Sequence, residues 1–352
     1  MPRPAPLPSP CPCSPAEGPE WESPQVRAWR APSRWPGPRT GWVSGGFGCR
    51  SITRCPRHRL FSPPLMAARL TAETSRIRLG AGGVMLPNHA PLIIAEQFGM
   101  LAALAPDRID LGLGRAPGTD GATAAALRRG AQANDAFPQQ VRELLGFLDD
   151  AFPPGHPYRD VHAVPGPWQA AQNRVPAEAA GSEVWMLGSS PYSARLAAQL
   201  GRPYAFALQF GDADIDTALR IYREEFRPSD ALAAPRTLVS VPVAVGSDPG
   251  EARRQASTSA MAMLRMFKRE SFLLLPPEEV EAYSGTAQER QVVKAYTDRT
   301  VHGTAATVAD RLEALHARTG IDEVMLVVGG HSAAFDEHGI ELIADHYRLP
   351  HT

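Results

Sequence analysis

The stretch Thr74–Asp120, TSRIRLGAGGVMLPNHAPLIIAEQFGMLAALAPDRIDLGLGRAPGTD, decides the fold. Ile77–Leu86 and Ile109–Leu113 are predominantly apolar, as in parallel strands buried on both faces, whereas Pro91–Leu104 carries its apolar residues at helical spacing. Both strands are followed by Gly, Pro, Asn or Arg residues, on the side where α/β proteins bind ligands. The stretch therefore predicts one βαβ unit with ligand-binding loops.

The alternation of strands and helices continues along the chain. Further strands are predicted at Glu183–Leu187, Tyr204–Gln209, Thr237–Val245 and Glu323–Val328. Helices are predicted at Met66–Ala72, Ala122–Arg129, Gln139–Phe147, Ser193–Leu200, Asp214–Phe226, Pro249–Lys268, Pro276–Ser284, Ala287–Tyr296 and Thr304–Thr319. This alternation predicts a parallel sheet, open or closed. Six strands follow residue 70, so a barrel of eight needs two more from the preceding segment.

Composition narrows the classes of partner. The 352 residues carry a formal net charge of −1, and no basic run interleaves with aromatic residues, which argues against nucleic acid and anionic membranes as partners. The longest apolar runs have the length of strands and fall far short of the ~20 residues that a membrane helix needs. We therefore expect a protein without a membrane segment that acts on a small molecule.

Residues 1–64 differ from the rest of the chain. They contain 15 of the 35 prolines, four of the six tryptophans, nine Arg and only three acidic residues. All four cysteines also lie there, and their spacing fits neither a zinc site nor a redox pair. The segment reads as a disordered extension or as an Arg-rich targeting segment, although its prolines oppose an amphipathic helix. Neither the cysteines nor the C-terminal histidines predict a metal site.

The loop Gly112–Gly118 follows a predicted strand and contains Arg115. A dinucleotide-binding fingerprint would need a third Gly where Pro117 stands. Arg115 is better suited to bind an anion, because its planar guanidinium can donate two hydrogen bonds to a phosphate or a carboxylate. A structural ion pair with a neighbouring helix is the alternative.

Three further segments are candidates for binding. Gly188–Ser193 lies between a strand and a helix, where its hydroxyls and amides either bind a phosphate or serve as ordinary helix caps. Gly80–Gly83 interrupts a strand, which either lets a flat ligand approach the backbone or forms a bulge. Asn88 and His89 are the polar pair at the tip of the next loop, and His89 is either a proton carrier or substrate contact, or a solvated surface residue.

Taken together, RIRLGAGGVMLPNHAPLIIAEQFGMLAALAPDRIDLGLGRAPGTD, GSSPYSARLAAQLG and VHGTAATVADRLEAL resemble the bacterial-luciferase-like flavin-dependent monooxygenases. The resemblance implies a (β/α)8 barrel of the TIM type that binds reduced FMN at the carboxyl ends of its strands. It places a non-prolyl cis peptide at Gly82 and Gly83, beneath the flavin ring. It also places the FMN phosphate at Arg115 and the loop with Ser189, Ser190 and Ser193, with Tyr192 close by.

The chemistry implied by the resemblance belongs to the flavin. Reduced FMN, supplied by a separate flavin reductase, reacts with O2 and oxidises an aldehyde or another small organic molecule, while the protein supplies a shaped and dry site. A cytoplasmic homodimer is expected. The alternative of the same fold is an oxidoreductase that transfers a hydride to or from a deazaflavin coenzyme.

The chain departs from the family before residue 65. Relatives end their second strand in a Glu-His-His motif whose first His is the usual catalytic candidate, and no such motif is present, so the catalytic residue is unknown. Yet Arg50–Thr53 can be written back into degenerate codons. Read in the frame that starts at the third base of the first codon, these codons give Glu-His-His. We infer a frameshifted segment, residues 1–64, with the first strands missing or disordered, followed by a barrel domain, residues 65–352. An inactive family member is the other interpretation.

Overall fold

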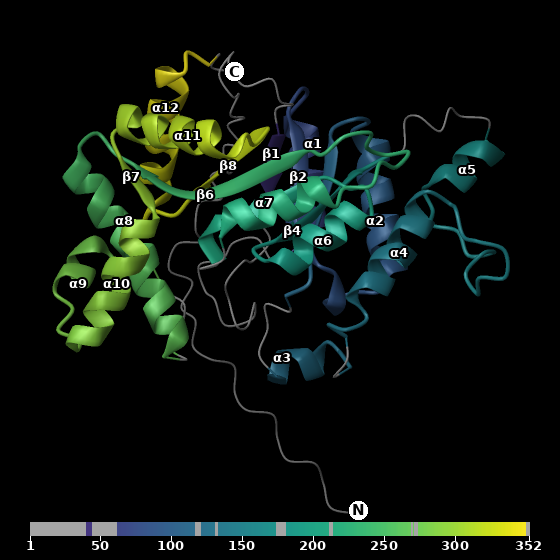
Figure 1. Ribbon diagram of the computed structural model, residues 1–352, viewed down its shortest axis with the longest axis horizontal. Helices are drawn as coiled ribbons and strands as arrows, with labels where there is room; N and C mark the ends of the chain where they lie inside the picture. Colours follow the sequence, from purple (N-terminus) through teal and green to yellow (C-terminus); the bar gives the residue numbers. More distant parts are fainter. Residues whose placement is uncertain are drawn as a thin grey trace, which may run out of the picture.

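The predicted strands form one parallel sheet. The computed structural model describes residues 40–43, 62–116, 121–130, 133–173, 181–210, 214–268, 270 and 274–349, and residues 40–43 and 121–123 are described by their backbone alone. Its strands are β1 (Thr40–Val43), β2 (Arg78–Met85), β3 (Ile109–Gly114), β4 (Glu183–Gly188), β5 (Tyr204–Ala207), β6 (Thr237–Val245), β7 (Val301–Gly303) and β8 (Glu323–Val328). Strands β1 to β6 are neighbours in chain order, and β6 pairs with both β7 and β8. The sheet is therefore a curled half-barrel (Figure 1).

Helices connect the strands and cover the sheet. They are α1 (Pro63–Glu73), α2 (Pro91–Leu104), α3 (Gly121–Ala126), α4 (Phe137–Leu148), α5 (Pro167–Gln172), α6 (Pro191–Gln199), α7 (Ile215–Glu224), α8 (Pro249–Phe267), α9 (Pro277–Glu281), α10 (Ala287–Arg299), α11 (Ala305–Thr319) and α12 (Ala333–His346). In Figure 1, α8, α9 and α10 lie together at one end of the molecule, while α4 and α5 lie toward the other. The expected barrel-type α/β fold is confirmed as a half-barrel.

Four elements differ from the sequence prediction. The strand β1 lies inside the segment for which no strand was expected, and it pairs in parallel with β2 from Thr40 opposite Arg78 onward. The predicted disorder of the rest of residues 1–61 falls outside the described residues. The three-residue strand β7 is too short to show an alternation, and α5 and α12 had no prediction at all.

The two faces of the sheet have different roles. Large side chains such as Leu79, Leu111 and Tyr204 are fully buried and pack in the main core between the sheet and its helices. A second cluster formed by Trp185, Ala205 and Leu238, with Leu187 and Met325 packed against it, occupies the inner face of the curl. Because side chains alternate along a strand, the inner face can be followed residue by residue.

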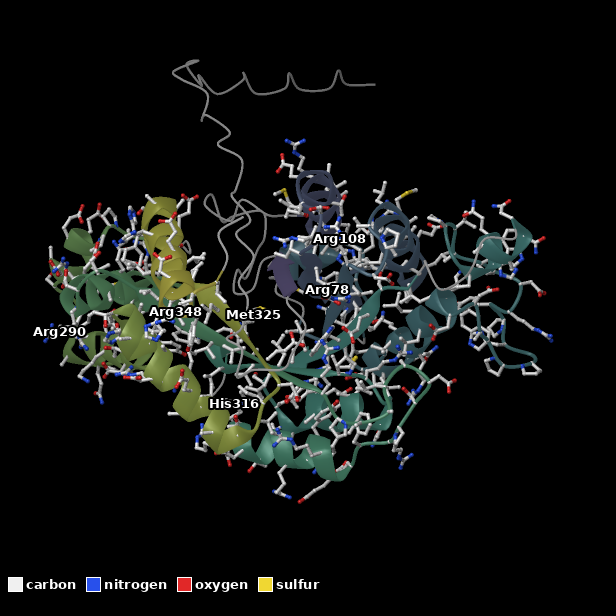
Figure 2. All side chains as sticks on the ribbon, turned by 90° about the horizontal axis from the view of Figure 1, so that it is seen from above. Arg78, Arg108, Arg290, His316, Met325 and Arg348 are labelled. Carbon is white, nitrogen blue, oxygen red and sulfur yellow. The ribbon has the colours of Figure 1, made fainter. Side chains whose placement is uncertain are left out.

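Charged residues fill the inner face at the amino ends of the strands. Arg78 bonds to Asp110 and lies 3.6 Å from Glu183, whereas Arg236 donates to Glu183 at 2.6 Å and to Glu323 at 2.5 Å. Burial raises the pKa of Asp110 to about 6 and that of Glu323 to about 7, against the opposing effect of their Arg partners. We call these five residues the charged layer. Figure 2 labels Arg78 near the middle of the molecule, with Met325 of β8 close to the centre as well.

The Pro-rich insertion between α4 and β4 packs on the outer layer of helices. A Cβ atom on Gly99 of α2 would lie 2.2 Å from the carbonyl oxygen of Pro165. Ser182 Oγ, next to β4, donates a hydrogen bond to the carbonyl of Phe98 at 3.2 Å. The glycine in α2 therefore allows the insertion to touch the helix backbone.

Candidate flavin site at the carboxyl ends of β2, β3 and β4

Glycines leave the carboxyl half of β2 and β3 without side chains on the inner face. Gly82 of β2 pairs with Gly112 of β3, which in turn pairs with Trp185 of β4. The peptide between Gly82 and Gly83 is cis, as the family resemblance implied. A Cβ atom on Gly83 would lie 2.7 Å from the carbonyl oxygen of Gly112 and 2.9 Å from Leu187 Cδ2. Only glycine therefore fits at position 83, and Gly82, Gly83 and Gly112 are all buried.

The structure brings Arg115 and Tyr192 together from two separate loops. Arg115 follows β3, and its guanidinium carbon lies 4.3 Å from the centroid of the Tyr192 ring in the first turn of α6. Both side chains are exposed, and a cation–π contact of this kind holds the guanidinium over the start of the helix. A guanidinium beside a helix N-terminus favours an anion.

The three serines of the β4–α6 loop have unequal environments. Ser190 is the N-cap of α6 but makes no side-chain capping bond, and both Ser189 and Ser190 are half-buried. Ser193 is buried, and its hydroxyl donates to the carbonyl of Ser190 at 2.8 Å and lies 3.2 Å from the Tyr204 hydroxyl. A Cβ atom on Gly188 would come within 2.2 Å of Ser193 Oγ. Ser193 therefore stabilises the loop from its buried side, while Ser189 and Ser190 lie on its more exposed side.

Asn88 and His89 follow β2 at the same carboxyl end. Asn88 ends a short 3-10 turn, and its Nδ2 lies 4.0 Å from Met85 Sδ. The backbone N–H of His89 donates to the carbonyl of Leu86 at 2.9 Å. Neighbouring atoms lower the pKa of His89 by desolvation, although the residue keeps an exposed surface, so its imidazole is mainly neutral at pH 7. A neutral imidazole can accept a proton or a hydrogen bond.

Sequence reasoning missed Gln209 and the charged layer. Gln209 was placed inside a strand, but β5 ends at Ala207 and Gln209 lies in the 3-10 turn that follows it. The charged layer had a signal in the sequence, because Arg78, Glu183 and Glu323 each begin a strand.

The described residues contain neither a metal site nor a membrane helix. Among them, no group of three or more His, Cys, Asp or Glu side chains is arranged to hold a metal ion. None of the helices in the same part of the chain is long and apolar enough to cross a membrane.

Comparison with known proteins gives the family. The profile of the luciferase-like monooxygenase family matches residues 40–323. A luciferase-like monooxygenase of Escherichia coli (strain K12) is 38% identical over 279 residues, 78% of each chain, and the uncharacterized protein YvbT of Bacillus subtilis (strain 168) is 37% identical over 281 residues, 80% of each. The crystal structure of apo-MsnO8 superimposes with a TM-score of 0.72 at 30% identity, covering 89% of this chain and 88% of that one. The chain belongs to the luciferase-like monooxygenase family.

More distant structures share the fold and differ in cofactor. The oxygenating constituent of 3,6-diketocamphane monooxygenase from Pseudomonas putida, solved with FMN, has a TM-score of 0.60 at 17% identity. An F420-dependent secondary alcohol dehydrogenase has a TM-score of 0.61 at 14% identity. At such identities the likeness concerns the fold alone, so the choice of cofactor must come from the residues of this chain.

Proposed function

We propose that this chain is a flavin-dependent monooxygenase that binds reduced FMN at the carboxyl ends of β2, β3 and β4. The observation that carries the proposal is the contact of Arg115 with Tyr192 over the first turn of α6, at the same carboxyl end of the sheet as the paired glycines Gly82 and Gly112. A cationic group, a helix N-terminus and a surface without side chains fit the phosphate and the flat ring of one ligand. When bound, reduced FMN supplies the reaction with O2 that oxidises a small organic substrate.

Each part of the site has its own task in this proposal. Arg115 donates hydrogen bonds to the phosphate, and the hydroxyls of Ser189 and Ser190 add further donors at the end of α6. Tyr192 holds the guanidinium in place, and Ser193 supports the loop through its bond to the Ser190 carbonyl. Asn88 and His89 face the substrate side.

The apolar outer surface of α2 supports the proposal of a homodimer. Only Glu96 is charged among the fourteen residues of α2, and a helix that is apolar on all sides is normally covered on all sides. Yet Ile93, Met100 and Leu104 are 47%, 51% and 58% exposed, and Leu65 of the adjacent α1 is 73% exposed. A second copy of the chain that packs on this face would bury these side chains.

The proposal also includes the cellular location of the enzyme and the source of its reduced FMN. The family resemblance favours a cytoplasmic enzyme that receives reduced FMN from a separate flavin reductase. The net charge near zero gives no reason to expect a strongly charged partner.

Binding of FMN and riboflavin tests the role of Arg115. Replacing Arg115 with Ala removes charge-assisted hydrogen bonds of about 1.5–3 kcal/mol, so the affinity for FMN should fall about ten- to a hundredfold. The affinity for riboflavin, which lacks the phosphate, should stay the same. Arg195→Ala is the matched control, since Arg195 lies on the same helix but pairs with Glu225. An equal loss for both ligands would disprove the phosphate role.

The two alternative functions are tested by the same titrations. A deazaflavin enzyme of this fold, as in the F420-dependent neighbour, would bind the deazaflavin coenzyme in preference to FMN and would not consume O2. An inactive family member would bind neither cofactor at micromolar concentration. Stoichiometric binding of FMN, followed by O2 consumption with the reduced cofactor, favours the proposed monooxygenase.

A further inference from the structure

The last helix of the chain packs closely on the carboxyl end of β6. α12 contacts β6, and a Cβ atom on Gly339 would lie 2.7 Å from the carbonyl oxygen of Val245, the last residue of that strand. A larger residue at position 339 would therefore push the helix away from the strand. The close approach brings His338 of α12 beside the loop of residues 246–248, which leads from β6 into α8.

The structure places three polar side chains of this loop and this helix in a row. The hydroxyl of Ser247 lies 3.1 Å from His338 Nε2, and His338 Nδ1 lies 3.9 Å from Glu341 Oε2, which is three residues further along α12. Ser247 is exposed, and the side chains of His338 and Glu341 are 50% and 37% exposed. A small molecule in solution can therefore reach the row.

The carboxylate of Glu341 decides which imidazole nitrogen of His338 carries the proton. A negative charge beside Nδ1 favours the proton on that nitrogen, so Nε2 is left as an acceptor. Ser247 then donates its hydroxyl hydrogen to Nε2, as a nucleophile does to its base. At 3.9 Å, Glu341 acts on the imidazole through its charge and not through a hydrogen bond.

The loop that carries Ser247 is held at the start of α8. The backbone N–H of Ser247 donates to Glu251 Oε2 at 3.2 Å. Asp248 Oδ1 accepts from the N–H groups of Gly250 and Glu251 at 2.8 and 2.9 Å and so caps the helix. These bonds keep the Ser247 hydroxyl beside the imidazole before any ligand binds.

We propose that Ser247 is the nucleophile of an ester-hydrolysing site, with His338 as its base and Glu341 as a positioning residue. The substrate class is a small carboxylic ester that reaches the site from solution. The inference goes beyond the proposed function and does not rest on it, because the reaction needs no flavin.

The reaction has two steps. Ser247 Oγ attacks the carbonyl carbon of the ester while His338 Nε2 takes the hydroxyl proton. The bond from that carbon to the leaving oxygen breaks, the alcohol leaves with the proton, and the acyl group stays on Ser247. Water then attacks the acyl carbon and gives a proton to His338 Nε2, and the carboxylic acid leaves as Ser247 regains this proton. One ester and one water thus give one acid and one alcohol.

Hydrolysis of 4-nitrophenyl acetate by the full chain, without added flavin, tests the assignment. The wild type should release 4-nitrophenol at least about tenfold faster than Ser247→Ala, since assistance by a general base typically contributes a factor of about 10² or more. Ser257→Ala should keep the wild-type rate. It is the matched control, because the Ser257 hydroxyl lies on α8 and donates to the carbonyl of Arg254 at 2.7 Å.

A fluorophosphonate probe gives a second measurement on the unaltered chain. Attack by Ser247 Oγ on the phosphorus would break the P–F bond, release fluoride and leave a phosphonylated serine. Mass spectrometry of the digested protein should find the label on Ser247. His338→Ala should take up the label much more slowly, because the hydroxyl then lacks its base.

Variants of α12 separate the roles of the base and the positioning residue. His338→Ala should lose ester hydrolysis as Ser247→Ala does, and imidazole added to the solution should restore part of the rate, because the exposed position admits a free base. His346→Ala, on the same helix with its ring 5.1 Å from that of Tyr347, should change nothing. Glu341→Gln should lower kcat about two- to fivefold and leave KM unchanged, as expected for the loss of a surface ion pair that does not touch the substrate.

Three results would overturn the inference. They are a wild-type chain that hydrolyses the ester no faster than Ser247→Ala, a fluorophosphonate probe that leaves Ser247 unlabelled, and a His338→Ala variant that keeps the full rate. A hydrogen bond that only fastens α12 to the loop has its own signature: Ser247→Ala would lower the unfolding free energy and leave hydrolysis unchanged.

Discussion

Glu323 of the charged layer should make the unfolding free energy of the chain depend on pH. Its side chain is 8% exposed, and burial raises its pKa from the ordinary 4.5 to about 7, although Arg236 contacts it at 2.5 Å. Between pH 4.5 and about 7, the folded chain therefore keeps a proton on Glu323 that the unfolded chain releases. Because the folded pKa is raised, the stabilisation is complete below pH 4.5 and is lost as the pH rises through 7. A difference of about 2.5 pKa units corresponds to about 3 kcal/mol.

Replacing Glu323 with Gln isolates this contribution. The amide has the shape of the protonated carboxyl and no charge at any pH, and Arg236 keeps its bond to Glu183 at 2.6 Å. The variant should match the wild type near pH 4 and exceed its unfolding free energy by about 2–3 kcal/mol at pH 8. Asp336, whose pKa burial also raises to about 6, lies outside the charged layer and affects both proteins alike.

Urea unfolding followed by circular dichroism at pH 4, 6 and 8 measures the difference. Glu289→Gln is the control of opposite sign, since hydrogen bonding to Lys268 lowers the pKa of the half-buried Glu289 carboxyl to about 2. That variant should lose stability at pH 8. A Glu323→Gln variant less stable than the wild type at pH 8 would refute the reasoning, because the ion pair with Arg236 would then outweigh the cost of burial.

Two further predictions concern packing and assembly. Gly99→Ala should destabilise the fold by about 1–3 kcal/mol despite the better helix propensity of Ala, because its Cβ would lie 2.2 Å from the Pro165 carbonyl. Gly130→Ala, where a Cβ meets no described atom within 4 Å, should be nearly neutral in the same unfolding measurement. Leu104→Glu, on the exposed apolar face of α2, should convert the proposed dimer to a monomer in light scattering, and the same change at the exposed Leu127, in the turn after α3, should not. A Leu104→Glu chain that keeps the mass of the proposed dimer would exclude this face as the interface.

Much of the fold could be predicted because its elements are long and periodic. The predicted bounds of α2, β6 and β8 agree with the structure, since each is an uninterrupted apolar or amphipathic run with Pro, Gly or charged residues at its ends. The prediction of β5 extended two residues too far, because Leu208 and Gln209 continue its apolar and polar alternation into a turn. The alternation of apolar and polar residues does not show where the backbone leaves the sheet.

The candidate site was predicted in part for a reason of topology. Residues that follow neighbouring parallel strands meet at one edge, so Arg115 after β3 and Tyr192 after β4 come into contact although they are far apart in sequence. The contact between Ser240 and Gln209 joins side chains of one strand and one turn, and no sequence motif predicts it. The cis peptide at Gly82 was expected from the family resemblance and is present.

The two ends of the inner face explain why a ligand site can form at one of them. At the amino ends of the strands, Arg78 and Arg236 are committed to three carboxylates, so ions from β2, β3, β4 and β8 fill the space with mutual contacts. At the carboxyl ends, Gly82 and Gly112 contribute backbone without side chains, and Arg115 and Tyr192 meet after β3 and β4. Because the ions at the amino end are paired with one another, we place the proposed ligand site at the carboxyl end of the described sheet.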